Sequence, residues 1–219
     1  RTSTTAYSSN PALCLRDYLT NTRYGKGLAT SSINDTLFNS AANKCDEDVT
    51  PYSGGTAQNI FEWHAVLDTG KALMTNVQIL LSGMRGLLPY SQGVYGLIVE
   101  DEGSSVYTFT EDHIIGGIQI DGVQKKNRYN RVIATYINPD NNYQTDQIEY
   151  PPASSSEYTT YLTEDGNIPL EKKISLSTIN NIYTAEDIAE IVLKRSRQGI
   201  VCSFNWTREA LQVSIGDIV

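Results

Sequence analysis

Residues 60–99 read IFEWHAVLDTGKALMTNVQILLSGMRGLLPYSQGVYGLIV, and this stretch decides the fold class. Ile60–Leu67 has the apolar and aromatic content of a strand, and Asp68 or Thr69 is placed to cap a following helix. Apolar residues then recur at helical spacing, at Leu73, Val77, Leu80, Leu81 and Met84. Two further apolar runs, Leu87–Tyr90 and Val94–Val99, flank Ser91-Gln92-Gly93 and predict a hairpin. The stretch therefore predicts a strand–helix–hairpin lobe.

The preceding residues predict a linker and two helices. Residues 1–9 are rich in Ser and Thr, and Asn10-Pro11 has the cap and first-turn proline of a helix start. The first helix carries Leu15, Tyr18 and Leu19, and Gly25 lies beyond its end. A second helix follows Ser32, with apolar positions at Ile33, Leu37, Ala41 and Cys45. We expect a linker and N-terminal helix over 1–32 and an α+β lobe over 33–122.

The second half is richer in strands. The expected strands are Val106–Phe109, Ile118–Ile120, Arg131–Asn138, Ile174–Leu176, Ile200–Trp206 and Leu211–Ile215. Pro139–Asn142 predicts a turn and Pro151–Glu157 a loop. A fourth helix opens at the capping pair Thr184 and Asp187 and stops at Gly199. The prediction is an α+β fold whose β-rich hub lobe, 123–219, is truncated at the C-terminus.

Composition excludes several classes of function. The chain has 219 residues, is 40% hydrophobic and carries a formal net charge of −8. An acidic balance argues against nucleic-acid binding, because phosphate contacts need clustered Lys and Arg. The three cysteines, Cys14, Cys45 and Cys202, form no CxxC pair, which argues against a disulfide framework or zinc site. No apolar run reaches the roughly 20 residues of a membrane span.

Asp68-Thr69-Gly70-Lys71 resembles two catalytic motifs. A phosphate loop needs a glycine where Ala65 stands and a Ser or Thr where Ala72 stands, so that motif is absent. Val66–Gly70 fits an aspartic-protease signature better, with 114–116 as its supporting strand. That mechanism needs two aspartates sharing a proton, and hence a homodimer. The amphipathic helix after Gly70 favours a simple helix cap.

The other ionisable clusters predict no cofactor and no metal. His64 and His113 have no partner at metal-ligand spacing, and the run 46–48 lacks the spaced ligands and glycine of a calcium loop. The mid-chain basic cluster consists of Lys125, Lys126, Arg128 and Arg131. It could meet an acidic partner, although a solvated strand entry is the simpler reading. The fourteen tyrosines suggest assembly interfaces.

Several stretches resemble the tail-tip, or host-specificity, proteins of lambda-like siphophages, and they occur in the family's order over nearly the whole chain. In the first half they are residues 10–13, 16–20 and 23–25; residues 68–71 and the helix to 86; and residues 90–93. In the second half they are residues 109–112 and 114–116; 128–132; 136–140; 189–190 and 193–198; and 211 and 216–219. Each is weak alone, and the ordered set is specific.

The resemblance implies a structural function without catalytic residues. Such proteins are similar to the baseplate hubs of contractile tails. They form rings of three subunits, join the tail tube to the tip fibre, and gate passage of the tape measure and DNA. We therefore expect a virion protein of a phage or prophage, made in the bacterial cytoplasm and homotrimeric when complete. Its host receptor would be bound by regions outside this chain.

Two alternatives remain open at this stage. One is an aspartic protease that acts as a homodimer through Asp68. The other is a carbohydrate- or receptor-binding module. Loss of proteolysis in an Asp68→Asn variant would favour the first, and glycan binding by this chain alone would favour the second.

Overall fold

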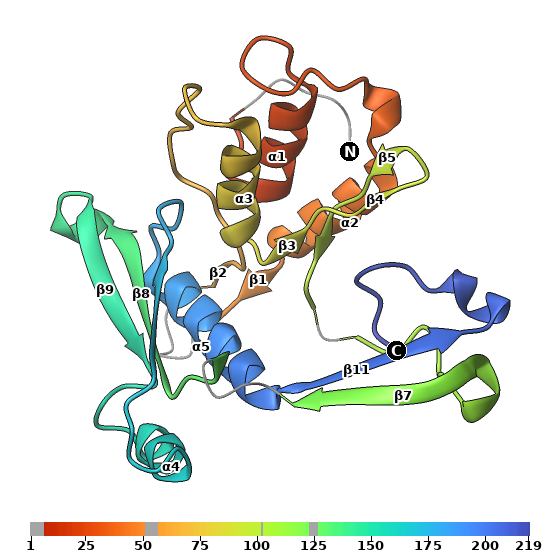
Figure 1. The fold of residues 1–219 in the computed structure, drawn as a ribbon. Coiled ribbons are helices and arrows are strands. Elements are labelled where there is room, and N and C mark those ends of the chain that lie inside the picture. The colour runs from red at the N-terminus through yellow and green to blue at the C-terminus, as the bar shows by residue number, and fades with distance from the viewer. Residues whose placement is uncertain (1–6, 51–56, 102, 123–126) are drawn as a thin grey trace. The chain divides into compact units, whose positions relative to one another are not determined.

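The computed structural model describes residues 7–50, 57–101, 103–122 and 127–219, apart from the side chains of 209 and 210. Its mixture of helices and strands confirms the α+β class (Figure 1). The chain divides into two compact units. Unit 1 is Arg1–Glu100, Ala134–Ile148 and Ser175–Asp187, and unit 2 is Asp101–Ile133, Glu149–Ile174 and Ile188–Val219. The consecutive ranges 1–32, 33–122 and 123–219 stay a prediction.

The first helix forms as its cap predicts. α1 spans Pro11–Thr20, with proline in its first turn and Asn10 as its N-cap. The Asn10 side-chain oxygen accepts from the backbone N–H groups of Ala12 and Leu13, which satisfies donors that a helix start leaves free. Its Nδ2 donates to the Ala42 carbonyl at 2.8 Å and to Asp46. One buried side chain therefore starts α1 and ties it to the next helix.

The second helix starts later than predicted and buries a different residue. α2 spans Asp35–Cys45, follows the short 3₁₀ turn η1 (Thr30–Ser32), and is capped by Asn34. Phe38 is buried, whereas the predicted Leu37 is 36% exposed. Phe38 shares one helix face with Ala41, Ala42 and Cys45 through i+3, i+4 and i+7 spacing. The predicted four-residue repeat was therefore one position out of phase at Leu37.

The predicted strand Ile60–Leu67 is wrong. Among the described residues of this region, the one ladder joins β1 (Asp48–Val49) to β2 (Gln58–Asn59), and residues 61–68 are irregular. Backbone N–H groups of residues 60–64 donate to carbonyls of separate segments instead. Ile60 donates to Glu47, Phe61 to Cys45, Trp63 to Ser9 and His64 to Thr178. Apolar content predicted a sheet partner, but four N–H donors of this segment bond individually to separate parts of the chain.

The third helix does not use Asp68 as its cap. α3 spans Leu73–Ser82, and its N-cap Ala72 makes no side-chain hydrogen bond. Asp68 Oδ1 instead accepts from the Gly70 N–H at 2.8 Å, so it stabilises the turn before the helix. Val77 and Leu80 are buried as predicted, and Leu73 and Leu81 are half-buried. The C-cap of α3 is Gly83.

The predicted hairpin is confirmed, with an interruption. β3 (Gly86–Leu87) pairs with β6 (Ile98–Val99), and β4 (Tyr90–Ser91) pairs with β5 (Val94–Tyr95), both antiparallel. The turn is the two-residue Gln92-Gly93, and both residues have positive φ, as a type I′ turn requires. The hairpin and the first three helices enclose one apolar core. Figure 1 shows the strands of the hairpin alongside α2, with α1 and α3 next to each other.

The three-stranded sheet was predicted in part. Its order is β10-β8-β9, with β8 at Arg131–Asn138 as predicted. The turn after β8 is confirmed as η4 (Pro139–Asn141). β10 spans Glu171–Ser175, three residues earlier than predicted, and two elements were missed: β9 (Gln144–Tyr150) and α4 (Ser156–Glu164). Ser155 caps α4 inside the predicted loop.

The long helix α5 spans Ile182–Gln198 and stops before Gly199 as predicted. It begins before the predicted capping pair, because Asn181 Oδ1 accepts from the Tyr183 N–H. β7 (Ile114–Gly122) and β11 (Ile200–Trp206) are strands as predicted, although β7 is longer. The predicted strand at 106–109 is irregular, and Leu211–Ile215 is instead partly in the 3₁₀ helix η5 (Arg208–Gln212).

Leu80 should contribute strongly to the stability of unit 1, because its side chain is wholly buried. Leu80→Ala is expected to lower the free energy of unfolding by about 2–5 kcal/mol. Met74 lies on the same helix and is exposed, so Met74→Ala should change it by less than about 0.5 kcal/mol. Urea denaturation of both variants measures the difference, and equal losses would contradict the assigned helix face.

Candidate assembly surface

The Asp68 turn does not continue into the β-structure that the protease reading requires. Asp68 is exposed, and α3 begins at Leu73, three residues after Gly70. No group of three or more His, Cys, Asp or Glu among the described residues is placed to hold a metal. None of the described helices is long and apolar enough to cross a membrane. The most distinctive surface lies elsewhere, on strands β7 and β11.

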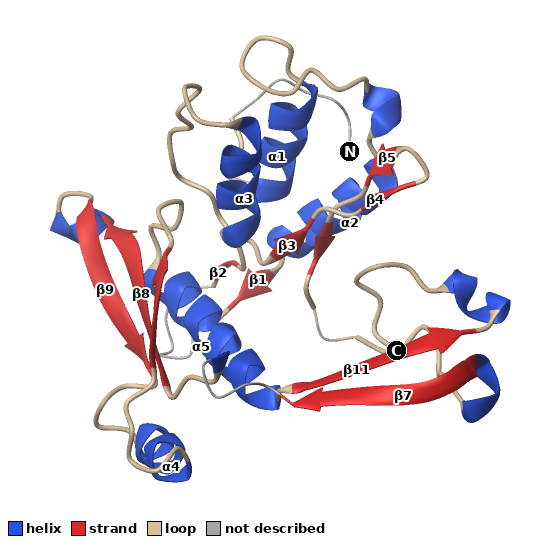
Figure 2. Cartoon of the chain, viewed as in Figure 1, coloured by secondary structure: helices blue, strands red, loops and turns tan. Residues whose placement is uncertain are grey.

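β7 and β11 form a two-stranded antiparallel ribbon, drawn as the long pair of arrows in Figure 2. Within the described residues, neither strand pairs with a third. The register shifts between the pairs Ser203–Gln119 and Asn205–Ile115, which leaves extra residues on β7. Gly116 lies in this bulge with φ +83°, a conformation that side chains other than glycine rarely adopt.

One face of the ribbon is apolar. Ile120 lies opposite Cys202, Gly122 opposite Ile200, and Ile114 opposite Trp206. Since alternate residues of a strand share a face, the apolar face comprises Ile114, Ile118, Ile120, Ile200, Cys202, Phe204 and Trp206. The reverse face carries Gln119, Asp121, Ser203 and Asn205, with Ile115 and Val201. The alternation is that of a sheet with one buried and one solvated face.

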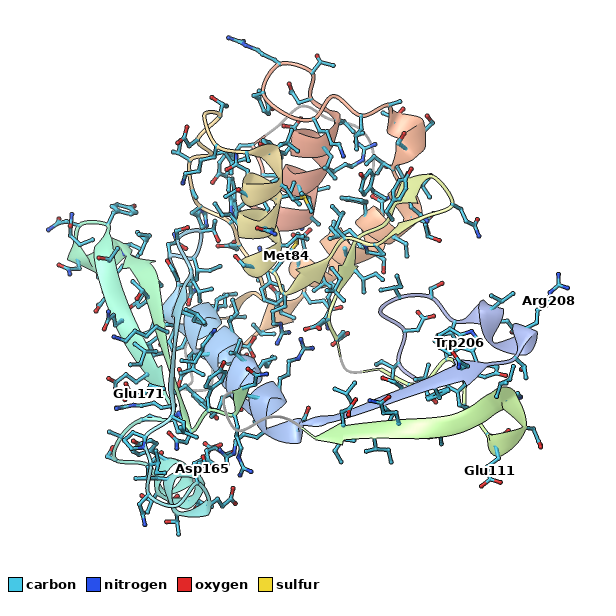
Figure 3. The ribbon with its side chains drawn as sticks, in the orientation of Figure 1. Met84, Glu111, Asp165, Glu171, Trp206 and Arg208 are labelled. Carbon is cyan, nitrogen blue, oxygen red and sulfur yellow. The ribbon has the colours of Figure 1, made fainter. Side chains whose placement is uncertain are left out.

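Aromatic residues cover one end of the apolar face. The Phe109 ring lies 5.2 Å from the Phe204 ring and 5.7 Å from the Trp206 ring, centroid to centroid, and is stacked on the latter. Tyr107 contacts Phe109 edge-on at 5.1 Å. Figure 3 labels Trp206 at this end of the ribbon. At the other end, Ile120 is 66% exposed and Ile200 70% exposed.

Apart from the bulge at Gly116, the ribbon has few of the features that protect free strand edges. Asp121 is the only charged residue in its two strands, and neither strand contains proline or lysine. Natural edge strands are usually protected by such residues. An isolated two-stranded sheet is also marginally stable in water. The ribbon is therefore suited to receive further strands or a second layer.

Arg128 and Arg131, the described residues of the basic cluster, form ion pairs with carboxylates of unit 2. Arg128 Nε lies 2.9 Å from Asp165 Oδ1, an ion pair without ideal hydrogen-bond alignment. Arg131 is paired with Glu149 and Glu171. Lys125 and Lys126 lie outside the described residues. The two arginines are thus occupied in holding unit 2 together.

The centre of this network is a nearly buried ion pair that the sequence did not reveal. Arg197 Nη1 donates to Asp165 Oδ2 at 2.8 Å, and their side chains are 9% and 4% exposed. The guanidinium also lies 4.1 Å from the Tyr161 ring centroid. Fully buried Asn130 donates to Asp165 and accepts from the Leu170 N–H. Figure 3 labels Asp165 in this part of unit 2.

Breaking this pair should destabilise unit 2. Asp165→Ala leaves the Arg197 guanidinium without its buried partner, and we expect a loss of about 3–5 kcal/mol of unfolding free energy. Glu171 pairs with Arg131 elsewhere in unit 2 and is more exposed, so Glu171→Gln should cost less than about 1 kcal/mol. Denaturant titration of the two variants distinguishes them. A small effect of Asp165→Ala on the free energy of unfolding would show that the ion pair contributes little to the stability of unit 2.

The histidines make ordinary local contacts. His64 Nε2 lies 3.3 Å from Glu62 Oε2, and the His113 ring contacts Thr110 and Tyr107. Several tyrosines of unit 2 are used internally and not at a surface. Tyr161 donates to Glu157, and burial raises the pKa of Tyr150, with Glu190 adding to the effect. Isoleucine is thus the main exposed apolar residue of the candidate surface.

The comparison with known proteins agrees with an assembly role. No protein-family model matches the chain. The chain is 24% identical over 148 residues to baseplate hub protein pb3 of Escherichia phage T5. It resembles a phage baseplate hub protein. The match covers 68% of this chain and 15% of the hub protein, so the chain corresponds to a small part of that protein's length. This distant similarity supports a structural role in the tail of a phage virion.

Proposed function

We propose that the chain is a non-enzymatic structural part of a phage tail hub and assembles through the apolar face of the ribbon. The observation that carries the proposal is the two-stranded ribbon itself, which exposes Ile118, Ile120, Ile200 and Trp206 on one face. Burial of such side chains contributes about 1.5–3 kcal/mol each. The similarity to a baseplate hub protein supports the same assignment.

The proposed partners of the ribbon are further copies of the same protein, in a homotrimeric ring. The chain carries a net charge of −8, so most surfaces of two copies repel each other. The ribbon is the exception, because Asp121 is its only charge. Copies can therefore meet there without burying like charges, and strands from neighbours would protect its open edges.

The same charge balance suits passage of DNA through the ring. An acidic or neutral channel wall repels the phosphate backbone and prevents adhesion. Arg128 and Arg131 are paired with carboxylates, which leaves them less available for phosphate. We further propose the role of the lambda-like tail-tip proteins: joining the tail tube to the receptor-binding fibre and gating passage of the tape measure and DNA. Host attachment would then use regions outside this chain.

A matched pair of ribbon variants tests the proposed assembly. Ile120 and Gln119 are neighbours on opposite faces of β7. In the intact protein, Ile120→Lys should abolish the trimer, because it would bury an unpaired ammonium group at the interface. Gln119→Lys should leave the trimer intact. Light scattering gives the molar mass, and a trimer that persists in Ile120→Lys would refute the role of this face.

The proposed channel has its own test. A map of the assembled ring should show Asp and Glu side chains, or neutral ones, facing the axis. A channel lined by Lys125, Lys126, Arg128 and Arg131 would overturn the electrostatic argument even if the threefold ring were found.

A further inference from the structure

The two free edges of the ribbon are not equivalent. The outer edge of β7 is interrupted, because the bulge leaves extra residues on this strand and holds Gly116 at φ +83°. Bulges bend a strand and disrupt further pairing along its edge. β11 runs through Ile200–Trp206 without glycine, proline or a charged residue. The edge of β11 is therefore the better acceptor of a further strand.

A second segment of unit 2 has the pattern of a strand but belongs to no sheet. Residues 211–215 read Leu-Gln-Val-Ser-Ile, and this alternation of apolar and polar residues is typical of a half-buried strand. In the structure, Leu211 lies in η5 and 213–215 are in neither helix nor strand. Leu211 is 71% exposed and Ile215 is 69% exposed. The apolar side chains at both ends of this pattern therefore remain largely in solvent.

The bonds that hold this segment are local or involve the stretch before β7. Ser214 and Asp217 bond to each other in a turn, and the Val106 N–H donates to the Ile218 carbonyl at 2.8 Å. Within the described chain, no backbone hydrogen bond joins 211–219 to β11. Figure 1 shows the chain leaving β11 through a short helical turn and a loop. Pairing as a strand would replace these local bonds of 211–215 with a ladder.

A ring of three copies requires two different surfaces on each copy. A surface that pairs with itself across a twofold axis gives a dimer, whereas a threefold ring needs a contact between unlike surfaces. The free edge of β11 and the segment 211–215 are two such surfaces. Neither contains a charged residue, so their contact buries no like charges although the chain carries a net charge of −8.

We propose that residues 211–215 of one copy form a strand on the outer edge of β11 of the neighbouring copy. The inference rests on the proposed homotrimer and names the contact that closes it. Ladder hydrogen bonds give the affinity of such strand addition, and the apolar side chains of alternate residues set its register. Leu211, Val213 and Ile215 then extend the apolar face that carries Cys202. A third strand also relieves the marginal stability of a two-stranded ribbon.

Disulfide cross-linking in the intact protein tests the proposal, because β11 carries the exposed Cys202. Side chains on the same face of adjacent strands come within reach of a disulfide. At least one of the variants Leu211→Cys, Val213→Cys and Ile215→Cys should therefore form covalent oligomers under mild oxidation. Each copy has one donor segment and one acceptor edge, so cross-linking should proceed to a covalent trimer that a reductant separates. Non-reducing electrophoresis measures the products.

Two kinds of control assign the contact. Gln212→Cys and Ser214→Cys place the thiol on the opposite face of the added strand, and they should give no covalent trimer. Cys202→Ser, added to the reactive variant, should abolish the trimer. Ile120 lies opposite Cys202 on β7, so Cys202→Ser with Ile120→Cys moves the thiol one strand further away. That combination should also fail to cross-link.

The outcomes separate this inference from the proposed function. If light scattering gives a trimer and none of the three apolar-position variants cross-links, the inference fails and the trimer stands. A disulfide within one chain would place the segment on its own β11 and overturn the exchange between copies. Covalent dimers as the end product, or equal cross-linking at 212 and 214, would also overturn it. An intact protein that is not trimeric would overturn both proposals.

Discussion

The backbone of Ile60–His64 is the constraint on which unit 1 depends. Four of its N–H groups bond to four separate places: Glu47, Cys45, Ser9 and Thr178. The wholly buried Phe61 ring sits in the middle, with the Arg85 guanidinium 5.2 Å from its centroid. Because buried donors must be satisfied, this short irregular segment fixes where α1, the end of α2 and the 175–187 segment lie.

Unit 2 is held together by a different kind of interaction. Asn130, Asp165 and Arg197 form a polar network in which each buried group has partners. Such a network specifies one arrangement of the surrounding backbone, since any shift leaves a charge unpaired. It also consumes the arginines that would otherwise give this acidic chain a phosphate-binding patch. On the ribbon, by contrast, several apolar side chains are exposed.

The contrast between satisfied and unsatisfied groups is the basis of the proposed assembly. On the ribbon, apolar side chains and strand edges face outward, which favours association with another protein surface. The distant similarity to a baseplate hub protein agrees with this proposal.

The sequence alone determined the features that depend on neighbouring residues: the Asn10 cap, the Gln92-Gly93 turn, β8, β11 and the end of α5 at Gly199. It failed where long-range contacts compete with local preference. Phe38, and not Leu37, is buried in the core of unit 1. The Asp68 cap failed for a local reason, because its side chain bonds to Gly70 two residues on, before the helix begins. The pairing of β7 with β11, separated by nearly eighty residues, exists only in the tertiary structure. No local pattern encodes which distant backbone or side chain will satisfy a given group.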